Sequence, residues 1–305
     1  MLPVVSISCV TFNHAKFIRQ CLDSFLMQET NFPFEIVIHD DASTDGTSEI
    51  IDEYAKNYPD KFFPIIQKEN QFSKGVRGIM AKFNLPRCKG KYIAWCEGDD
   101  YFTDSKKLQK QYDLLQSNPN CKIVFHNCLK VDDTGKTIGL VYDYLPKDFS
   151  LIDTFSGSYA KTCTMMFVNN SNIIKENIID DTTYGMELLR DGGTAVYINE
   201  IMSAYRVHSG GIWSQKKAGE KFKLQLAAEN KIKNNFYASH AHYLDKRFKS
   251  FFRDSTFDLA KEKELKLAFT SFLEYYKYEK SKSELVNSFK HFIKLLFLNS
   301  SPKSN

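Results

Sequence analysis

The chain has 305 residues, of which 43% are hydrophobic and 26% are charged, and its formal net charge at pH 7 is +4. This composition supports a large buried core and excludes a predominantly disordered chain. No apolar run approaches the roughly 20 residues of a membrane-spanning helix, and no secretion signal is evident at the start. The seven cysteines are scattered, without a C-x-x-C pair or a Cys/His cluster. We therefore expect a cytoplasmic protein with reduced cysteines and no structural zinc.

The first hundred residues alternate between strand and helix patterns. Val4–Val10 is almost continuously apolar and rich in β-branched residues, which indicates a strand buried on both faces. The whole series predicts strands at 4–10, 34–39, 62–67 and 91–96, and helices at 15–28, 48–58 and 76–88. This order predicts an α/β fold with a mainly parallel, Rossmann-like central sheet and helices on both faces.

Polar or acidic clusters follow three of the predicted strands. They are Thr11–Asn13, Asp40–Asp41 and Glu97–Asp100. Because the carboxyl ends of parallel strands meet at one edge of a sheet, we expect the three clusters to converge there, where such sheets bind ligands. Three carboxylates within four residues need a cation, and Mg²⁺ or Mn²⁺ carrying a diphosphate fits. The alternative is an acidic turn that caps the next segment.

These strand ends favour a nucleotide site without the usual phosphate loops. Neither G-x-G-x-x-G nor a Walker A sequence follows the first strand. A carboxylate at the end of the second strand can accept hydrogen bonds from a base or a ribose, and Phe12 can stack on a base. Without a glycine cradle, the diphosphate would be held through a metal at Asp99.

Three ordered motifs resemble those of the family two glycosyltransferases, which have the GT-A fold. They read VVSISCVTFN from Val4, EIVIHDDASTDGT from Glu35 and GKYIAWCEGDD from Gly90. The resemblance extends from Val4 to about Ser214, and the three motifs together are far more specific than any one of them.

The resemblance implies roles for residues of these motifs. It places the first motif at the nucleotide base, makes Asp41 a ligand of the base and makes Asp99 the ligand of the metal. Glu97 stands where the family commonly has aspartate and is expected, like Asp100, to contact ribose or sugar or to lie just behind the metal. The expected nucleotide contacts are Val10, Phe12, Asp41, Lys82, Glu97 and Gly98.

The resemblance also implies a general base. A run that starts at Asp180 matches the family's Gly-Asp-aromatic segment ahead of a helix, which makes Asp181 the candidate. The run departs from the pattern, with Asp180 for glycine and Thr182 for the aromatic residue, so Asp180 and Glu187 remain rivals. The alternative is that Asp180 or Asp181 only caps the helix predicted at 184–190.

A later glycine-containing loop, Arg-x-His-Ser-Gly-Gly, also resembles the family. His208 in this loop is expected to contact the metal or the diphosphate, with Arg206 close by, although a lone histidine is usually structural. Trp213 is expected to form part of a sugar platform or to anchor the loop. Further residues expected to meet phosphate or hydroxyl groups are Arg77, Lys82, Lys161 and Thr162.

The resemblance implies a metal-dependent, inverting glycosyltransferase of the hexosyltransferase type. It would move a sugar from a nucleotide-diphosphate sugar, UDP-sugar above all, to a hydroxyl of a growing surface glycan such as lipopolysaccharide or capsule. Mn²⁺ or Mg²⁺ would stabilise the departing diphosphate, and Asp181 would take the proton of the acceptor. The sequence alone does not exclude a retaining double displacement. The alternative function is a non-catalytic nucleotide-sugar or glycan-binding module on the same fold.

The C-terminal part differs in charge and pattern. Residues 216–305 carry a net charge of +9, against −5 for 1–215, and have helical periodicity. We expect a GT-A domain at 1–215, with a nucleotide-binding half at about 1–100 and an acceptor-binding half at about 101–215, and then a basic helical extension. Its last amphipathic helix suits the inner face of an anionic membrane that carries a lipid-linked acceptor. The alternative is packing against the catalytic domain or a second copy of the chain. We expect no nucleic-acid partner.

Overall fold

The computed structural model describes residues 2–142, 148–155, 160–170, 173, 178–211 and 216–298. The chain divides into two compact units. The first runs to His208, apart from a short segment that begins at Phe155. The second consists of that segment and the residues from Ser209 onward.

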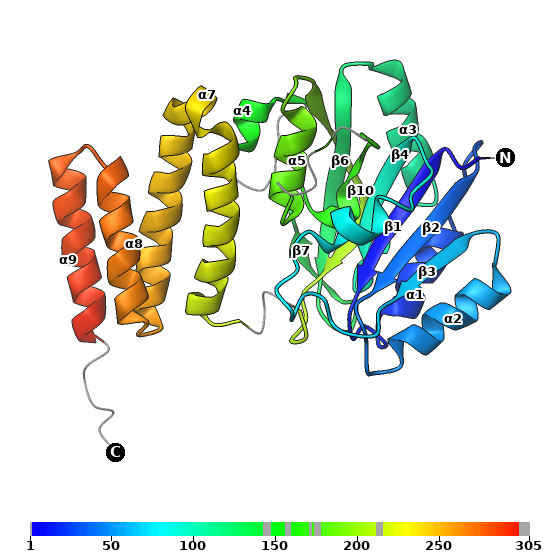
Figure 1. Ribbon diagram of the computed structural model, residues 1–305, viewed down its shortest axis with the longest axis horizontal. Helices are drawn as coiled ribbons and strands as arrows, with labels where there is room; N and C mark the ends of the chain where they lie inside the picture. The colour runs from blue at the N-terminus through cyan, green and yellow to red at the C-terminus, as the bar shows by residue number, and fades with distance from the viewer. Residues whose placement is uncertain are drawn as a thin grey trace. The chain divides into compact units, whose positions relative to one another are not determined.

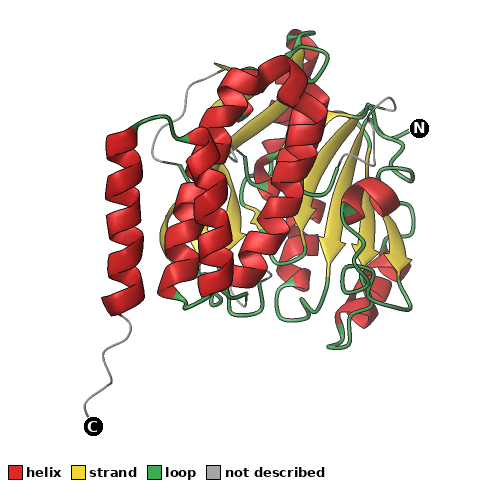
Figure 2. Ribbon diagram, turned by 60° about the vertical axis from the view of Figure 1, so that its left-hand side comes forward, coloured by secondary structure: helices red, strands yellow, loops and turns green. Residues whose placement is uncertain are grey.

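A ten-stranded sheet forms the centre of the first unit as far as the chain is described (Figures 1 and 2). Its strands are β1 Val5–Thr11, β2 Phe34–Asp40, β3 Phe62–Ile66, β4 Tyr92–Glu97, β5 Tyr101–Phe102, β6 Cys121–Val131, β7 Thr137–Leu140, β8 Asp148–Phe149, β9 Met166–Val168 and β10 Thr194–Arg206. The main path runs β3-β2-β1-β4-β9-β6-β10-β5, with β7 paired to β6 and β8 to β10. The first four strands of this path are mutually parallel, as are β6 and β10, whereas β9 is antiparallel to both of its neighbours. The prediction of a mainly parallel sheet is confirmed.

Helices cover both faces of this sheet. They are α1 Ile18–Leu26, α2 Thr47–Asn57, α3 Lys107–Ser117, α4 Leu151–Thr154 and α5 Asp181–Leu189, with a π-helical turn η1 Met80–Asn84 and a 3₁₀ turn η2 Thr162–Thr164. Ile36 and Ala94 belong to a core cluster with apolar residues of α1, α2 and α3. Their chain neighbours Val37 and Ile93 point the other way, into a cluster with η1 and α5. Successive strand residues face opposite sides, which explains why these strands are apolar throughout.

The segment predicted as a helix at 76–88 is shorter and wound differently. Only Met80–Asn84 is helical, as a π-turn. Gly75 and Gly78 have φ angles of +88° and +66°, which a right-handed helix cannot contain. At the end of the turn, the side-chain amide of Asn84 donates to the carbonyl groups of Cys9 (2.9 Å) and Val37 (3.3 Å), and so ties η1 to two strands. The prediction of a helix over the full range was therefore wrong.

The register of the parallel strands brings the three polar clusters to one edge. Thr11 at the end of β1 lies opposite Asp40 of β2, and Val10 lies opposite Glu97 of β4. The amide of Asp41 donates to the carbonyl of Thr11 at 3.0 Å. The loops that follow β1, β2 and β4 therefore begin side by side.

The described part of the second unit consists of helices α7 Ala218–Lys261, α8 Leu265–Tyr278 and α9 Lys282–Leu298 (Figure 1). The long α7 is bent at His240, whose φ of −135° is not helical. Phe248 and Phe252 of α7 contact the ring of Tyr278 in α8. Among the described helices, none combines the length and the apolar character needed to cross a bilayer.

Candidate active site

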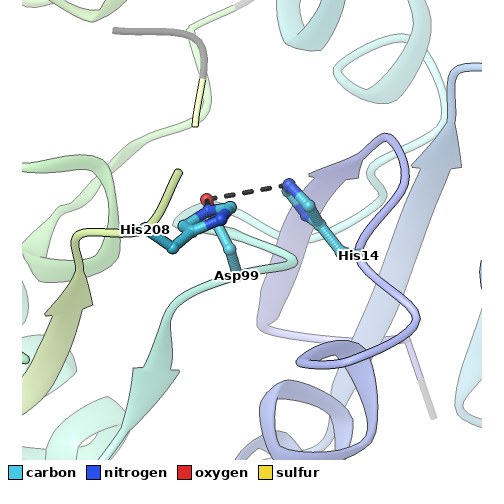
Figure 3. A group of neighbouring side chains, drawn as sticks. All are labelled: His14, Asp99 and His208. Carbon is cyan, nitrogen blue, oxygen red and sulfur yellow. Dashed lines mark hydrogen bonds and ion pairs between the residues drawn. The ribbon is translucent and has the colours of Figure 1, made fainter. Parts of the chain in front are cut away.

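Three side chains meet where β1, β4 and β10 end (Figure 3). His14 lies in the loop after β1, Asp99 in the loop after β4, and His208 just beyond β10. Oδ2 of Asp99 lies 3.0 Å from Nε2 of His208 and 3.7 Å from Nε2 of His14. The candidate ligand atoms of the three residues all lie within 4.8 Å of one another. Asp99 and His208, both expected to contact the metal, thus lie next to each other, and His14 joins them; metal binding by these residues stays a prediction.

The turn after β1 explains how His14 reaches this position. Asn13 adopts a left-handed φ of +55°, which asparagine tolerates better than most residues. Its side-chain oxygen accepts a hydrogen bond from the amide of Thr44 at 2.8 Å. Nδ1 of His14 lies 3.1 Å from Oγ1 of Thr11, so Nε2 is the ring nitrogen that faces the carboxylate.

Sequence reasoning assigned no role to His14. The feature that could have indicated a role is its position in the polar segment that follows the first strand, three residues after Thr11. In one sequence, such a histidine cannot be distinguished from a structural one. In the fold, burial lowers the pKa of His14, which favours the neutral ring that binds metal ions.

Arg206 supports the Asp99 loop. Its Nε donates to the carbonyl oxygen of Asp99 at 2.9 Å, and Nη2 donates to Oε1 of Gln20 at 2.6 Å. Its backbone amide donates to Oδ1 of Asp100 at 2.8 Å. Arg206 is buried. This geometry suits a role behind the metal site, while contact with a sugar stays a prediction.

The three carboxylates after β4 have different environments. Burial, together with the charges of Asp99 and Asp181, raises the pKa of Glu97 to about 8. Burial also raises the pKa of Asp100 well above its usual range, and Oδ2 of Asp100 has no hydrogen-bond partner. Burial is the largest single influence on Asp99 and opposes its ionisation, but the hydrogen bond to His208 together with the charges of His14 and His208 outweighs burial and lowers the pKa of Asp99. The cluster therefore carries more acidic groups than its surroundings neutralise.

This donor set fits a divalent metal ion. Asp99 with the two histidines forms one possible ligand group, and Glu97, Asp99 and Asp100 form a second that overlaps it. Carboxylate oxygens and neutral imidazole nitrogens are ordinary ligands of divalent ions. The unpartnered oxygen of Asp100 is a buried polar atom that an ion or its bound water would satisfy.

The acidic pair at the end of β2 is engaged by the chain itself. Asp41 is buried, and its two carboxylate oxygens accept hydrogen bonds from the amides of Gln71 (2.9 Å) and Phe72 (3.0 Å). Asp40 accepts from the hydroxyl of Ser43 in the turn that follows and from the hydroxyl of Ser48 in the first turn of α2. In this arrangement Asp41 fastens the loop after β3, and its contact with a nucleotide base stays a prediction.

Other expected nucleotide contacts stand around the same edge. Val10 is half-buried in β1, Phe12 is 42% exposed just after it, and Lys82 is exposed on η1. Close packing requires glycine at position 98, because a Cβ atom there would lie 2.6 Å from Oγ1 of Thr11. The nucleotide contacts of these residues stay predictions.

The three candidate bases lie on or next to helix α5 and differ in their contacts. Asp180 is its N-cap, and Oδ1 of Asp180 accepts from the amide (2.8 Å) and the hydroxyl (2.7 Å) of Thr183. Glu187 is buried and its carboxylate pairs with the guanidinium of Arg190. Both rivals of Asp181 are therefore engaged in structural contacts.

Asp181 is the first residue of α5, and its Oδ1 accepts from the amide of Thr182 at 2.8 Å. Its charge contributes to the raised pKa of Glu97, so the two carboxylates lie within electrostatic range of each other. Burial and the charge of Asp180 raise the pKa of Asp181 to about 6, against the opposing charge of Lys161. A carboxylate with that pKa is ionised at neutral pH and is a stronger base than an ordinary aspartate.

The remaining predicted residues are placed as follows. Thr162 donates to Oε2 of Glu97 at 3.3 Å, so η2 reaches the acidic rim. Arg77 donates to the carbonyl oxygen of Phe72 at 2.9 Å and stacks on its ring. Trp213 lies outside the described residues.

A large open groove lies elsewhere on the first unit. It has a volume of about 1000 Å³, and its lining includes Pro33, Lys61 and Gln109. Pro33 and Lys61 precede β2 and β3, so the groove is at the amino ends of the parallel strands. Ligands of such sheets bind at the carboxyl ends, which favours the acidic rim as the site.

A model of glycosyl transferase family 2 matches residues 6–176, more than half of the chain. The chain therefore belongs to glycosyltransferase family 2. This membership agrees with the resemblance in the three motifs and with the fold.

Curated relatives include an uncharacterized protein of Mycobacterium tuberculosis, 34% identical over 217 residues, which cover 68% of this chain and 60% of the relative. The chain thus spans less than two thirds of that relative's length. A second relative is the Escherichia coli enzyme WfaP, a UDP-Glc:alpha-D-GlcNAc-diphosphoundecaprenol beta-1,3-glucosyltransferase. It is 27% identical over 254 residues, which cover 78% of this chain and 89% of WfaP.

Solved structures share the GT-A fold. TarS 1–349 of S. aureus in complex with UDP-GlcNAc superimposes with a TM-score of 0.60 at 16% identity, covering 96% of this chain and 81% of that one. A Pyrobaculum calidifontis mannosyltransferase in complex with GDP-Man and Mn²⁺ gives a TM-score of 0.59 at 14% identity, covering 97% and 81%. At these identities the likeness establishes the fold.

Proposed function

We propose that the protein is an inverting glycosyltransferase that moves a sugar from a nucleotide-diphosphate sugar to a hydroxyl group of a surface glycan, with Asp181 as general base and a divalent metal at Asp99. The observation that carries the proposal is the environment of Asp181. Its charge acts on Glu97 of the acidic rim, and Oδ1 of Asp181 accepts from the amide of the adjacent Thr182 at 2.8 Å. Asp180 instead caps α5 through Thr183, and Glu187 forms an ion pair with Arg190.

The printed activities of relatives support the kind of donor and acceptor. WfaP takes UDP-Glc and acts on a sugar linked to diphosphoundecaprenol, and TarS binds UDP-GlcNAc. We propose a UDP-sugar as donor and a growing glycan, lipid-linked as for WfaP, as acceptor. A metal bound at Asp99 would act as a Lewis acid on the leaving diphosphate.

The chain's own residues have distinct tasks in this reaction. Asp181 accepts the proton of the attacking hydroxyl, which raises the nucleophilicity of the oxygen as the bond to the anomeric carbon forms. Arg206 holds the carbonyl of Asp99 and so fixes the loop that carries this ligand. One displacement from the side opposite the nucleotide inverts the anomeric carbon. A retaining mechanism would instead need a carboxylate that attacks this carbon.

The test is turnover of UDP-sugars with Mn²⁺, compared between the wild type and Asp181→Asn. We expect the substitution to lower turnover by about 10²- to 10⁴-fold, the usual contribution of a general base. Nucleotide affinity, measured by calorimetry, should stay within a few-fold. Equal turnover of both proteins would refute the role of Asp181. A wild type that binds a UDP-sugar and never transfers it would support the alternative, a non-catalytic binding module.

We further propose that α9 makes a peripheral membrane contact beside a lipid-linked acceptor. Ser288 and Phe292 of this helix are buried, whereas Val286 and Phe289 are exposed next to the exposed Lys290. Apolar side chains beside lysines suit an anionic bilayer surface. Packing against a second copy of the chain is the competing explanation.

Flotation with phosphatidylglycerol-rich vesicles tests this contact on the full chain. Val286→Ser with Phe289→Ser should reduce recovery with the vesicles, whereas the matched control Asn287→Ser should not. Equal recovery of all three proteins would end the membrane proposal, and a dimer that dissociates in the double variant would favour the second copy.

A further inference from the structure

We propose that His14 is a direct ligand of the metal, so that His14, Asp99 and His208 form a two-histidine, one-carboxylate site that prefers first-row transition ions such as Mn²⁺ to Mg²⁺. This inference rests on the proposed function, because it concerns the metal of the same site. It adds a ligand that the three sequence motifs did not indicate, and it chooses between two ions that the sequence left open.

The distances between the side chains are the first observation that supports a shared metal ion. Nε2 of His14 lies 3.7 Å from Oδ2 of Asp99, which is too long for a hydrogen bond. Two ligand atoms that are each about 2.1 Å from one ion lie about 3.0 Å apart at a right angle and about 3.4 Å apart at a tetrahedral angle. The 3.0 Å to Nε2 of His208 is a hydrogen-bond distance that a shared ion would also give, and the 3.7 Å to Nε2 of His14 is slightly beyond the tetrahedral value.

The contacts behind His14 carry the second step. Nδ1 of His14 is directed at Oγ1 of Thr11, 3.1 Å away, so Nε2 is the ring nitrogen directed at the site. The amide of His14 donates to Oγ1 of Thr47 at 2.9 Å, which fixes the backbone. Metal-binding histidines commonly have such a second partner, because it sets the tautomer and the orientation of the ring. Figure 3 shows the rings of His14 and His208 converging on Asp99 from separate loops.

The preference among metals follows from ligand chemistry. Mg²⁺ is a hard ion that favours oxygen ligands and holds its water firmly, whereas imidazole nitrogen suits Fe²⁺, Ni²⁺ and Zn²⁺ best. Mn²⁺ also takes oxygen ligands, but as a first-row transition ion it accepts imidazole more readily than Mg²⁺ does. A site with two imidazoles and one carboxylate therefore discriminates against Mg²⁺ more strongly than a site with one imidazole. Removal of His14 should weaken Mn²⁺ binding and also reduce the preference for Mn²⁺.

Electron paramagnetic resonance on the full chain tests the ligand directly, without turnover. The chelator-treated protein is titrated with Mn²⁺, and the modulation of the electron spin echo reports ¹⁴N nuclei of coordinated imidazole. We expect two coupled imidazoles in the wild type and one in His14→Gln or His208→Gln. The exposed His242 of α7 supplies the matched control, and His242→Gln should retain both couplings.

Affinities give the second readout. Partners behind a ligand are worth about 10- to 100-fold in metal affinity, so loss of His14 itself should weaken Mn²⁺ binding by about tenfold or more. The ratio of Mg²⁺ to Mn²⁺ dissociation constants should fall in the same variant.

The outcomes separate this inference from the proposed function. A wild type with one coupled imidazole would overturn the ligand role of His14 even if no variant folds well. Two couplings that persist in His14→Gln, or an unchanged Mg²⁺ to Mn²⁺ ratio, would also overturn it. Two couplings in a protein without transferase activity would leave the inference standing and count against the proposed function alone.

Discussion

Two acidic clusters lie at the ends of strands β2 and β4 of the same sheet, yet they differ in how many hydrogen bonds they receive from the chain. At the end of β2, Asp40 and Asp41 accept hydrogen bonds from amides and hydroxyls of the chain. At the end of β4 and just beyond it, Glu97 and Asp100 have raised pKa values caused first by burial, and one oxygen of Asp100 has no hydrogen-bond partner. The first cluster is satisfied by the fold, whereas the second needs protons or a cation.

The comparison shows what makes acidic residues at a strand end a ligand site. Buried carboxylates are costly unless they are hydrogen-bonded or paired with positive charge. Backbone amides meet that need for Asp41, and they do so by fixing a loop. After β4 the chain supplies too few donors, so a divalent ion would gain from entering. Changes to the cluster after β2 should therefore affect mainly stability, and changes to the cluster after β4 should affect mainly metal binding and turnover.

The largest effect is expected from Asp99→Asn. The substitution removes the charged oxygen that faces both His14 and His208. Metal stabilisation of a leaving group is worth several kcal/mol, so the rate of transfer should fall by about a thousandfold or more. Calorimetry should show loss of Mn²⁺ binding, and the melting temperature of the metal-free protein at neutral pH should fall, because the lowered pKa of Asp99 means that its ionised form stabilises the fold. Undiminished Mn²⁺ affinity would show that the metal binds elsewhere, and the proposed difference between the two acidic clusters would then be wrong.

The next effect concerns pH. Burial and the charge of Asp180 raise the pKa of Asp181 to about 6, and a base acts only when deprotonated. Turnover should therefore be level above the pKa and should fall about tenfold for each pH unit below it. A pH profile of kcat/KM measures this. A profile that stays level down to pH 4.5 would exclude Asp181 as the titrating base.

Asp181 should also influence stability, with the opposite sign. An acid whose pKa is raised by folding favours the protonated form, so its ionisation above about pH 6 destabilises the folded state. Asp181→Asn should raise the melting temperature at pH 8, and the gain should shrink at pH 5. An activity loss that accompanies a stability gain is typical of a functional group.

A smaller effect is expected from Asp41→Asn at the other cluster. The side-chain nitrogen of asparagine is a donor and cannot accept a hydrogen bond, so one of the backbone amides of Gln71 and Phe72 loses its partner. Because hydrogen bonds to charged groups contribute about 1.5–3 kcal/mol, the free energy of unfolding should fall by about 2 kcal/mol. Denaturant titration measures this. Affinity for Mn²⁺ without nucleotide should be unchanged; a loss of Mn²⁺ binding comparable to that of Asp99→Asn would erase the distinction between the clusters.

The fold was largely predictable because its signals are local and repeated. Continuous apolar runs at β1, β2 and β4, separated by amphipathic helices, predict a buried parallel sheet. The turn at η1 was missed because its winding depends on two glycines with positive φ and on the long-range bonds of Asn84. Hydrophobic periodicity carries no information about either.

The candidate site was predictable where residues follow strands directly. The motifs predicted Asp99 as a metal ligand and placed Asp41 at the end of a strand. They did not predict that the chain would supply hydrogen-bond donors to Asp41 and too few to the cluster after β4. The amides that engage Asp41 come from a loop about 30 residues away, and His14 meets Asp99 across 85 positions of sequence. Such pairings arise only from the register of the sheet, so one sequence does not show which carboxylates the chain itself will satisfy.

The smallest effect should come from Asp180, the neighbour of the candidate base. Asp180→Ala removes the side chain that caps α5 and should lower the free energy of unfolding by about 1 kcal/mol, whereas Asp180→Asn, also a good N-cap, should cost little. Both variants remove a charge that raises the pKa of Asp181, so both should shift the acid limb of the pH profile to lower pH. Turnover at pH 8 should fall much less than in Asp181→Asn. If Asp180→Asn instead abolished turnover as Asp181→Asn does, Asp180 would share the role of base and the separation of cap from base on α5 would be wrong.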